Sequence, residues 1–106
     1  MPDRKFHRKR YIAFEFVKGG DEVGRKDLAH AINERLFRSN ANLKYDVILI
    51  RAHKGIVLTS HLDANRLREI LNSFELEDSG FEMRTLGTSG TILTLKEKFF
   101  KGQDLG

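Results

Sequence analysis

Histidines and carboxylates are the side chains of this 106-residue sequence that could bind a metal or transfer protons. No two histidines have the i, i+4 spacing of helical metal ligands, and none belongs to a histidine–carboxylate triad. The four are His7, His30, His53 and His61. Glu75, Glu77 and Asp78 could hold a hard cation, but an acidic run of this kind is more often a solvated loop. The sequence therefore predicts no metal site and no titratable pair for catalysis.

The segment Gly87-Thr88-Ser89-Gly90 could hold an anion. It is not a nucleophile elbow, which needs Gly-x-Ser-x-Gly, and no lysine follows its second glycine as in a P-loop. Between a predicted strand and a predicted helix, its amides and hydroxyls could bind one phosphate oxygen. Alternatively, the glycines only make the turn while Thr88 or Ser89 caps the helix. The residues alone leave both interpretations open.

Basic charge is concentrated at the start of the chain. Residues 1–10 carry a net charge of +4, whereas residues 11–106 hold fourteen basic and fourteen acidic side chains. The basic residues of this arm are Arg4, Lys5, Arg8, Lys9 and Arg10. Such an arm suits a polyanion, because each neutralised phosphate releases counterions. A solvated tail, a translation-start artefact or a lipid-surface contact would have the same composition.

The composition excludes several classes of protein. The absence of cysteine excludes a disulfide scaffold, a thiolate metal centre and a cysteine nucleophile. No apolar run approaches the roughly 20 residues of a membrane span, and the charged N-terminus is unlike a signal peptide. We therefore expect one soluble, cytoplasmic domain with no membrane partner.

The spacing of apolar residues predicts a first strand at residues 10–17 and a first helix at residues 26–39. In the strand, every second side chain on one face is apolar, namely Ile12, Phe14 and Phe16. The apolar stripe of the helix consists of Leu28, Ala31, Ile32 and Leu36, widened by Ala29 and Phe37.

Two further strands are predicted at residues 45–51 and 55–61, joined by a turn of residues 52–54 with Gly55 at its exit. Residues 47–50 are apolar on both faces, whereas a sheet with one wet face alternates, so we expect the second face to be partly covered. The remaining predicted elements are a helix capped by Asp63 and ending near Ser73, an acidic loop at residues 75–80, a strand at residues 81–86 that Gly87 ends, and a last helix at about residues 90–100.

The order β-α-β-β-α-β plus a final helix predicts an α+β, ferredoxin-like (RRM-like) sandwich with a four-stranded antiparallel sheet. Right-handed crossovers place both crossover helices on one face, which leaves the other face for the last helix, a partner or RNA. The predicted organisation is a basic arm at residues 1–9, a single domain at residues 10–100 and a frayed end at residues 101–106. The third strand has no aromatic residue for base stacking, so RNA contact would use phosphates, shape and loops.

Three segments of the chain together carry a family resemblance. A basic run, RKRYIAFE, leads into the first strand at residues 8–15. The segment LGTSGTI at residues 86–92 precedes a basic helix that ends Lys98-Phe99-Phe100, and a hairpin occupies residues 47–61. Over about residues 8–100, the sequence thus resembles the archaeal and eukaryotic ribonuclease P protein component 2 family.

This resemblance implies a ferredoxin-like subunit of ribonuclease P, the ribonucleoprotein that removes 5′ leaders from precursor tRNA. It implies that the RNA, with bound Mg²⁺, carries the chemistry, while this chain binds no cofactor and has no catalytic residue. It also implies pairing with the barrel-shaped component 3 subunit, with a possible homodimer inside a heterotetramer. The alternative is a protein-interaction module of a ribonucleoprotein that makes no direct RNA contact.

Candidate RNA contacts follow from charge and from the start of the last helix. They are Arg4, Lys5, Arg8, Lys9, Arg10, Arg51, Lys54, Thr88, Ser89, Gly90, Thr91, Lys96 and Lys98. The lysines and arginines would neutralise phosphates, and residues 88–91 would donate amide and hydroxyl hydrogen bonds. Arg51 and Lys54, on the hairpin, are secondary candidates.

Overall fold

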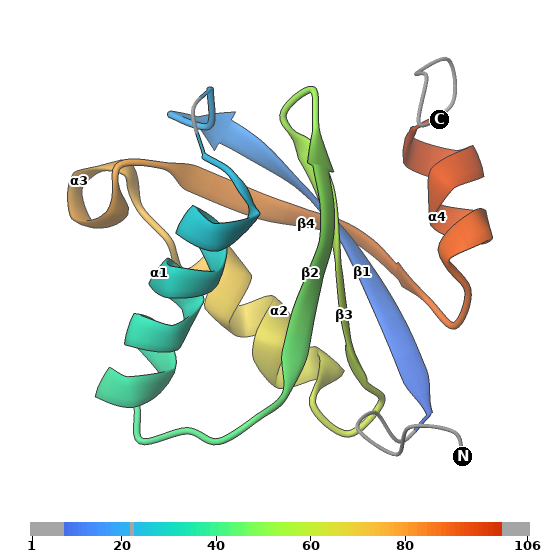
Figure 1. Cartoon of the computed structure of the whole chain (residues 1–106), viewed down its shortest axis with the longest axis horizontal. Coiled ribbons are helices and arrows are strands. Elements are labelled where there is room, and N and C mark those ends of the chain that lie inside the picture. The colour runs from blue at the N-terminus through green and yellow to red at the C-terminus, as the bar shows by residue number, and fades with distance from the viewer. Residues whose placement is uncertain (1–7, 22, 101–106) are drawn as a thin grey trace.

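A computed structural model describes residues 8–21 and 23–100 (Figure 1). In chain order, its elements are β1 (Lys9–Lys18), α1 (Arg25–Arg38), β2 (Tyr45–Arg51), β3 (Lys54–Ser60), α2 (Ala64–Asn72), α3 (Leu76–Ser79), β4 (Glu82–Ser89) and α4 (Ile92–Phe99). The strands form one sheet in the order β2-β3-β1-β4, and all neighbouring pairs are antiparallel. This is the ferredoxin-like order, so the predicted fold class is confirmed, including the additional C-terminal helix.

The helices lie on both faces of the sheet: α1 and α2 cover one face, and α4 lies on the other (Figure 1). The main core fills the space between the sheet and the first two helices. From β1 it contains the predicted alternating residues Ile12, Phe14 and Phe16, and from α1 it contains Leu28 and Ile32. The rings of Phe14 and Phe16 meet edge to face with centroids 5.6 Å apart. The period-two pattern of β1 thus correctly identified the main core face.

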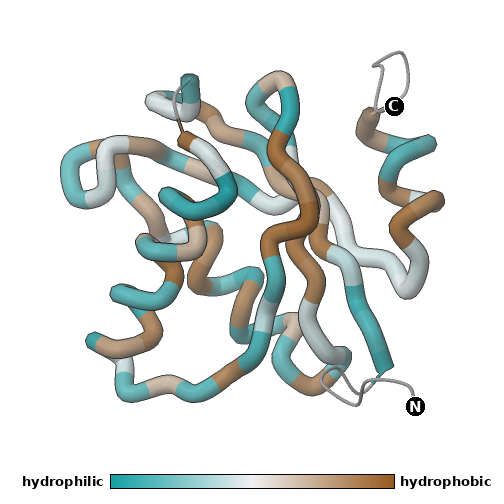
Figure 2. Tube along the Cα trace, in the orientation of Figure 1, coloured by the Kyte–Doolittle hydropathy of each residue, from teal (hydrophilic) through white to brown (hydrophobic). Residues whose placement is uncertain are grey.

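A second, smaller hydrophobic cluster lies beneath α4. Its buried members are Ala13, Ile56, Leu95 and Phe100. Ile48 and Leu49, from the doubly apolar run of β2, pack against it. Figure 2 shows this run as the hydrophobic segment in the middle of β2. The expectation that the second face is covered is therefore confirmed, and α4 is the element that covers it.

The hairpin turn is one residue shorter than predicted. It consists of Ala52 and His53, whose φ angles of 54° and 69° are those of a type I′ turn, so β3 begins directly after them. Gly55 is not at the turn exit but is buried inside β3. A Cβ there would lie 2.6 Å from the Leu49 carbonyl oxygen and would collide with the Phe14 ring. Gly55 is thus required by packing rather than by the turn.

The fourth strand does not end at Gly87. β4 continues through Gly87 and pairs with β1 beyond it. The glycine is needed for another reason, because it makes room for the ring of Phe99. A Cβ at Gly87 would lie 2.9 Å from two atoms of that ring. The predicted caps Thr88 and Ser89 therefore lie in the strand, and the N-cap residue of α4 is Thr91.

The structure also tests the predictions for residues 75–80, Phe37 and Asp63. The first two predictions are wrong, and the third is confirmed. The acidic segment at residues 75–80 contains a single helical turn, α3, which Gly80 closes with a φ of 85°. Phe37 does not extend the buried stripe of α1, since it is 88% exposed. Asp63 does occupy the N-cap position of α2, although its side chain makes no capping hydrogen bond.

Candidate nucleic-acid interface

The start of β1 and the end of β4 bring most of the predicted RNA contacts together. Tyr11 pairs with Ser89 across the two strands, so Arg10 lies beside Gly90. Its Nη1 atom is 3.5 Å from the position that a Gly90 Cβ would occupy. We call this group the α4 N-terminal cluster; it consists of Arg8, Lys9, Arg10, Thr88, Ser89, Gly90 and Thr91.

Backbone hydrogen bonds hold the basic side of this cluster in place. The His61 N–H donates to the Arg8 carbonyl over 2.9 Å, and Lys9 pairs with Ser60 of β3. The Arg10 guanidinium donates to the Lys9 carbonyl, also over 2.9 Å. Arg8 and Lys9 are exposed and Arg10 is half-buried. The cationic residues therefore start from a backbone that the sheet fixes.

The first turn of α4 places amide donors beside these cations. The Thr91 N–H donates to the Ser89 hydroxyl over 3.2 Å, and the hydroxyls of Thr91 and Thr94 lie 2.8 Å apart. Further amides of a first helical turn have no partner within the helix. Gly90, just before the positive end of the helix, lies next to Arg10, and this combination favours an anion.

The other four described candidates surround the opposite end of the same helix. We call them the α4 C-terminal cluster; they are Arg51, Lys54, Lys96 and Lys98. The Lys54 ammonium donates to the Phe99 carbonyl over 3.0 Å, which satisfies an acceptor at the helix end and places a cation at its negative pole. A helix of eight residues is about 12 Å long. The two clusters thus flank one exposed helix.

Arg4 and Lys5 lie outside the described residues, as do most of the predicted arm and the predicted frayed end at residues 101–106. The interface described above therefore consists of the other eleven candidates.

The titratable side chains form surface pairs rather than a reaction centre. His30 lies 3.9 Å from Glu34, and His53 lies 3.3 Å from Asp21, all with exposed side chains. Burial between α1 and β2 raises the pKa of Tyr45. Among residues 8–21 and 23–100, no three potential metal ligands come together, and no helix is long and apolar enough to cross a membrane.

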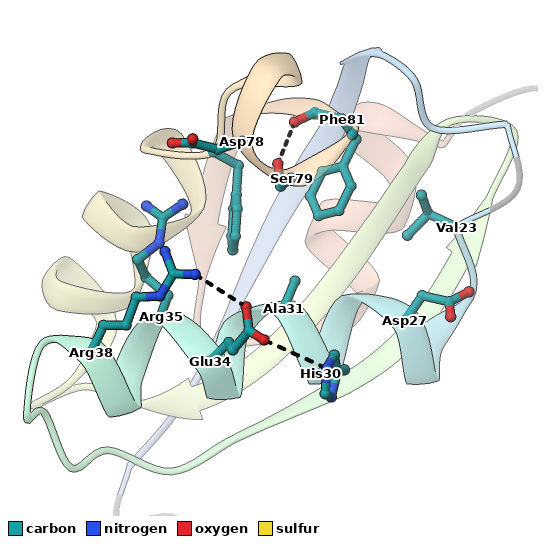
Figure 3. A pocket seen from close by; sticks show the side chains of 12 residues that line it. Val23, Asp27, His30, Ala31, Glu34, Arg35, Arg38, Asp78, Ser79 and Phe81 are labelled. Carbon is teal, nitrogen blue, oxygen red and sulfur yellow. Dashed lines mark hydrogen bonds and ion pairs between the residues drawn. The ribbon is translucent and has the colours of Figure 1, made fainter.

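A cavity of about 510 Å³ lies between α1 and the segment that joins α2 to β4 (Figure 3). Ala31, Phe74 and Phe81 contribute its apolar lining. Its charged or titratable lining residues are Asp27, His30, Glu34, Arg35, Arg38 and Asp78. The five of these residues that lie on α1 have the spacing of an ordinary solvated helix face, so the sequence alone did not predict the cavity. It forms only because the α3 turn folds over that face.

The fold and the basic clusters define a class of protein: a ferredoxin-like α+β domain whose second sheet face is closed by a helix with cations at both ends. No family model matches the sequence, and no curated protein matches it. Among solved structures, the chain is similar to a chain in the cryo-EM structure of yeast ribonuclease MRP, with a TM-score of 0.63 and 14% sequence identity. The match covers 91% of this chain and 92% of the yeast chain. At this identity, the similarity establishes a shared fold.

Proposed function

We propose that this chain is a protein subunit of a ribonucleoprotein endoribonuclease, and specifically of ribonuclease P, the enzyme that removes 5′ leaders from precursor tRNA. The observation that carries the proposal is the similarity to a chain of yeast ribonuclease MRP over almost the full length of both chains. The resemblance of residues 8–15 and 86–92 to the component 2 family is independent of that comparison, because it rests on sequence motifs. A cytoplasmic location is part of the proposal.

In this function the chain supports a catalytic RNA and breaks no bond itself. The RNA, with its own Mg²⁺, would carry the phosphodiester chemistry, and precursor tRNA would meet the chain only within the holoenzyme. The two clusters at the ends of α4 would neutralise RNA phosphates, apart from Lys54, whose ammonium is engaged by the Phe99 carbonyl. A component 3 subunit would pair with the chain, with a homodimer at the centre of a heterotetramer.

Reconstituted cleavage of precursor tRNA at low Mg²⁺ tests the function. Ribonuclease P RNA and its other protein subunits are assayed with and without this chain. We expect the chain to raise the cleavage rate, because a subunit that shields phosphates lowers the Mg²⁺ concentration that the RNA needs. An unchanged rate would remove the proposal.

The salt dependence of RNA binding tests the interface. An Arg10→Gln and a Lys98→Gln variant should each reduce the log–log salt slope by about 1, since each would lose one phosphate contact. The matched control is Arg68→Gln, because Arg68 is exposed on α2 and belongs to neither cluster. If all three variants keep the wild-type slope, the clusters do not bind phosphates.

The second candidate function is a protein-interaction module whose partners alone contact RNA. The position of α4 favours it, because that helix covers the sheet face on which related modules stack bases. A gel-shift assay with ribonuclease P RNA separates the two functions. A shift by the isolated chain supports direct binding, and a shift only in the presence of component 3 supports the module.

A further inference from the structure

The cavity beside α1 lies on the opposite side of the sheet from α4 (Figures 1 and 3). Its volume of about 510 Å³ is that of a site that accepts a small ligand or a long side chain. The proposed RNA contacts do not use it.

Two aromatic rings give the cavity an apolar lining. The ring centroids of Phe74 and Phe81 are 5.2 Å apart, and the two residues are 2% and 5% exposed. The small side chain of Ala31, on α1, faces the ring of Phe81 across the cavity (Figure 3). A ligand with an aliphatic portion can therefore bury it against this lining.

Both arginines at the cavity are already engaged by the chain itself. The Arg35 guanidinium lies 4.6 Å from the centroid of the Phe74 ring and donates to the carbonyl and the hydroxyl of Ser73. Arg38 pairs with Glu34 at 3.6 Å. The charge of Arg38 is therefore balanced by Glu34, and Nη1 of Arg35 is occupied by Ser73.

Two carboxylates at the cavity, Asp27 and Asp78, keep oxygen atoms that accept no hydrogen bond from the described residues. Asp27 accepts a hydrogen bond from the Gly24 N–H through Oδ2 only, over 3.0 Å. Asp78, in the first turn of α3, makes no side-chain hydrogen bond or ion pair within the described ranges. With three carboxylates and two guanidiniums, the cavity carries a formal charge of −1 when His30 is neutral. The charge available to a ligand is thus negative, which disfavours RNA and favours a cation.

A large exposed aromatic residue lies on α1 close to the rim of the cavity, although it is not part of the lining. Phe37 follows Glu34 by three residues on α1, so the two share a helix face, and Phe37 is 88% exposed. Aromatic residues are enriched at protein interfaces. A small free cation would leave Phe37 uncovered, whereas a protein partner seated on the cavity would bury it.

We propose that this cavity is a docking site for a protein partner and that it receives a lysine or arginine side chain of that partner. The aliphatic stem lies against Ala31 and the exposed edge of Phe81, and the cationic head pairs with Asp78. Phe37 packs against the adjoining partner surface. This inference rests on the proposed function for the identity of the partner, which is the component 3 subunit. The cavity face then holds component 3, and the α4 face binds RNA.

The cationic preference is tested on the full chain alone, by NMR titration with acetyl-Ala-Arg-Ala-amide and with the charge-inverted peptide acetyl-Ala-Glu-Ala-amide. We expect amide signals of α1 and α3 to shift with the arginine peptide only, and Asp78→Asn to weaken its binding several-fold. Glu69→Gln, at an exposed carboxylate of α2, is the matched control and should change nothing. Equal shifts with both peptides, or an Asp78→Asn variant that binds normally, overturn the proposal.

The partner is tested by calorimetry with component 3. Phe37→Ser and Asp78→Asn should each weaken binding about tenfold, as loss of a well-buried interface contact does, with the salt slope of RNA binding unchanged. If component 3 binds both variants as tightly as wild type, this face is not its docking site. If the wild-type chain binds the arginine peptide but not component 3, the pairing in the proposed function fails and the cavity's preference for a cation is upheld.

Discussion

Asn72, the last residue of α2, holds Thr85 of β4 through two hydrogen bonds. Its Oδ1 atom accepts from the Thr85 N–H over 2.9 Å, and its Nδ2 atom donates to the Thr85 hydroxyl over 3.1 Å. At this point the β1–β4 register shifts, from Ala13 opposite Gly87 to Phe14 opposite Thr85. A helix side chain therefore supplies the edge strand with partners at an irregularity of the sheet.

Replacing Asn72 with Ala should lower the free energy of unfolding by about 1 kcal/mol, because two hydrogen bonds are lost at a partly solvated site. Urea denaturation measures the change. Asn65→Ala is the control, since Asn65 is exposed on the same helix and no side-chain hydrogen bond is found for it in the described part of the chain. Equal effects at the two positions would mean that the contact to β4 contributes nothing.

Leu95 should be the residue through which α4 is held on the sheet. It is 1% exposed and packs with Ala13 and Ile56, whereas Leu93 on the same helix is 62% exposed. Leu95→Ala should destabilise the fold by about 2–5 kcal/mol, and Leu93→Ala by less than about 0.5 kcal/mol. Urea denaturation of the pair measures the difference. A Leu95→Ala variant as stable as Leu93→Ala would show that α4 is only loosely attached.

The fold was largely predictable because its signals are local. The alternation in β1 identifies one core face, and the doubly apolar run of β2 indicates that the other face is covered. The roles of two glycines were predicted wrongly, because both depend on side chains that are distant in the sequence. Gly55 makes room for Phe14, and Gly87 makes room for Phe99, twelve residues further along the chain. Such contacts between distant residues cannot be predicted from the residues that surround each glycine in the sequence.

The candidate site was predictable in composition but not in arrangement. The basic residues and the Ser89–Gly90 turn are visible in the sequence, whereas their proximity follows from the pairing of Tyr11 with Ser89. The bond from Lys54 to the end of α4 joins residues 45 positions apart and has no sequence signal. The cavity beside α1 was missed for a similar reason, since the α3 turn was expected to be a loop.

Tyr45 should make the protein lose stability at high pH. Its hydroxyl donates to the Ala29 carbonyl over 2.8 Å and lies 2.6 Å from Asn33 Oδ1. Burial raises the pKa of Tyr45 above the usual 10.0, so above that pH the unfolded chain releases this proton while the folded chain retains it. The folded state then binds more protons, and the free energy of unfolding falls as pH rises.

A Tyr45→Phe variant should be about 1 kcal/mol less stable at neutral pH, because it lacks the hydroxyl's hydrogen bonds, and should decline less steeply above pH 10.0. Urea denaturation across alkaline pH measures both effects. Tyr11→Phe is the control, because it leaves Tyr45 in place and should keep the steep decline. If Tyr45→Phe declines as steeply as wild type, another group causes the alkaline loss.

Lys54 should act as a cap for α4 rather than as a phosphate contact. Lys54→Met keeps the apolar stem but cannot donate to the Phe99 carbonyl, so we expect the free energy of unfolding to fall by about 1 kcal/mol and hydrogen exchange to quicken in the last turn of α4. The salt slope of RNA binding should not change. Lys98→Met, at an exposed lysine of the same helix end, should do the reverse: stability is kept and the slope falls by about 1. A Lys54→Met variant whose slope falls like that of Lys98→Met would assign Lys54 to the RNA.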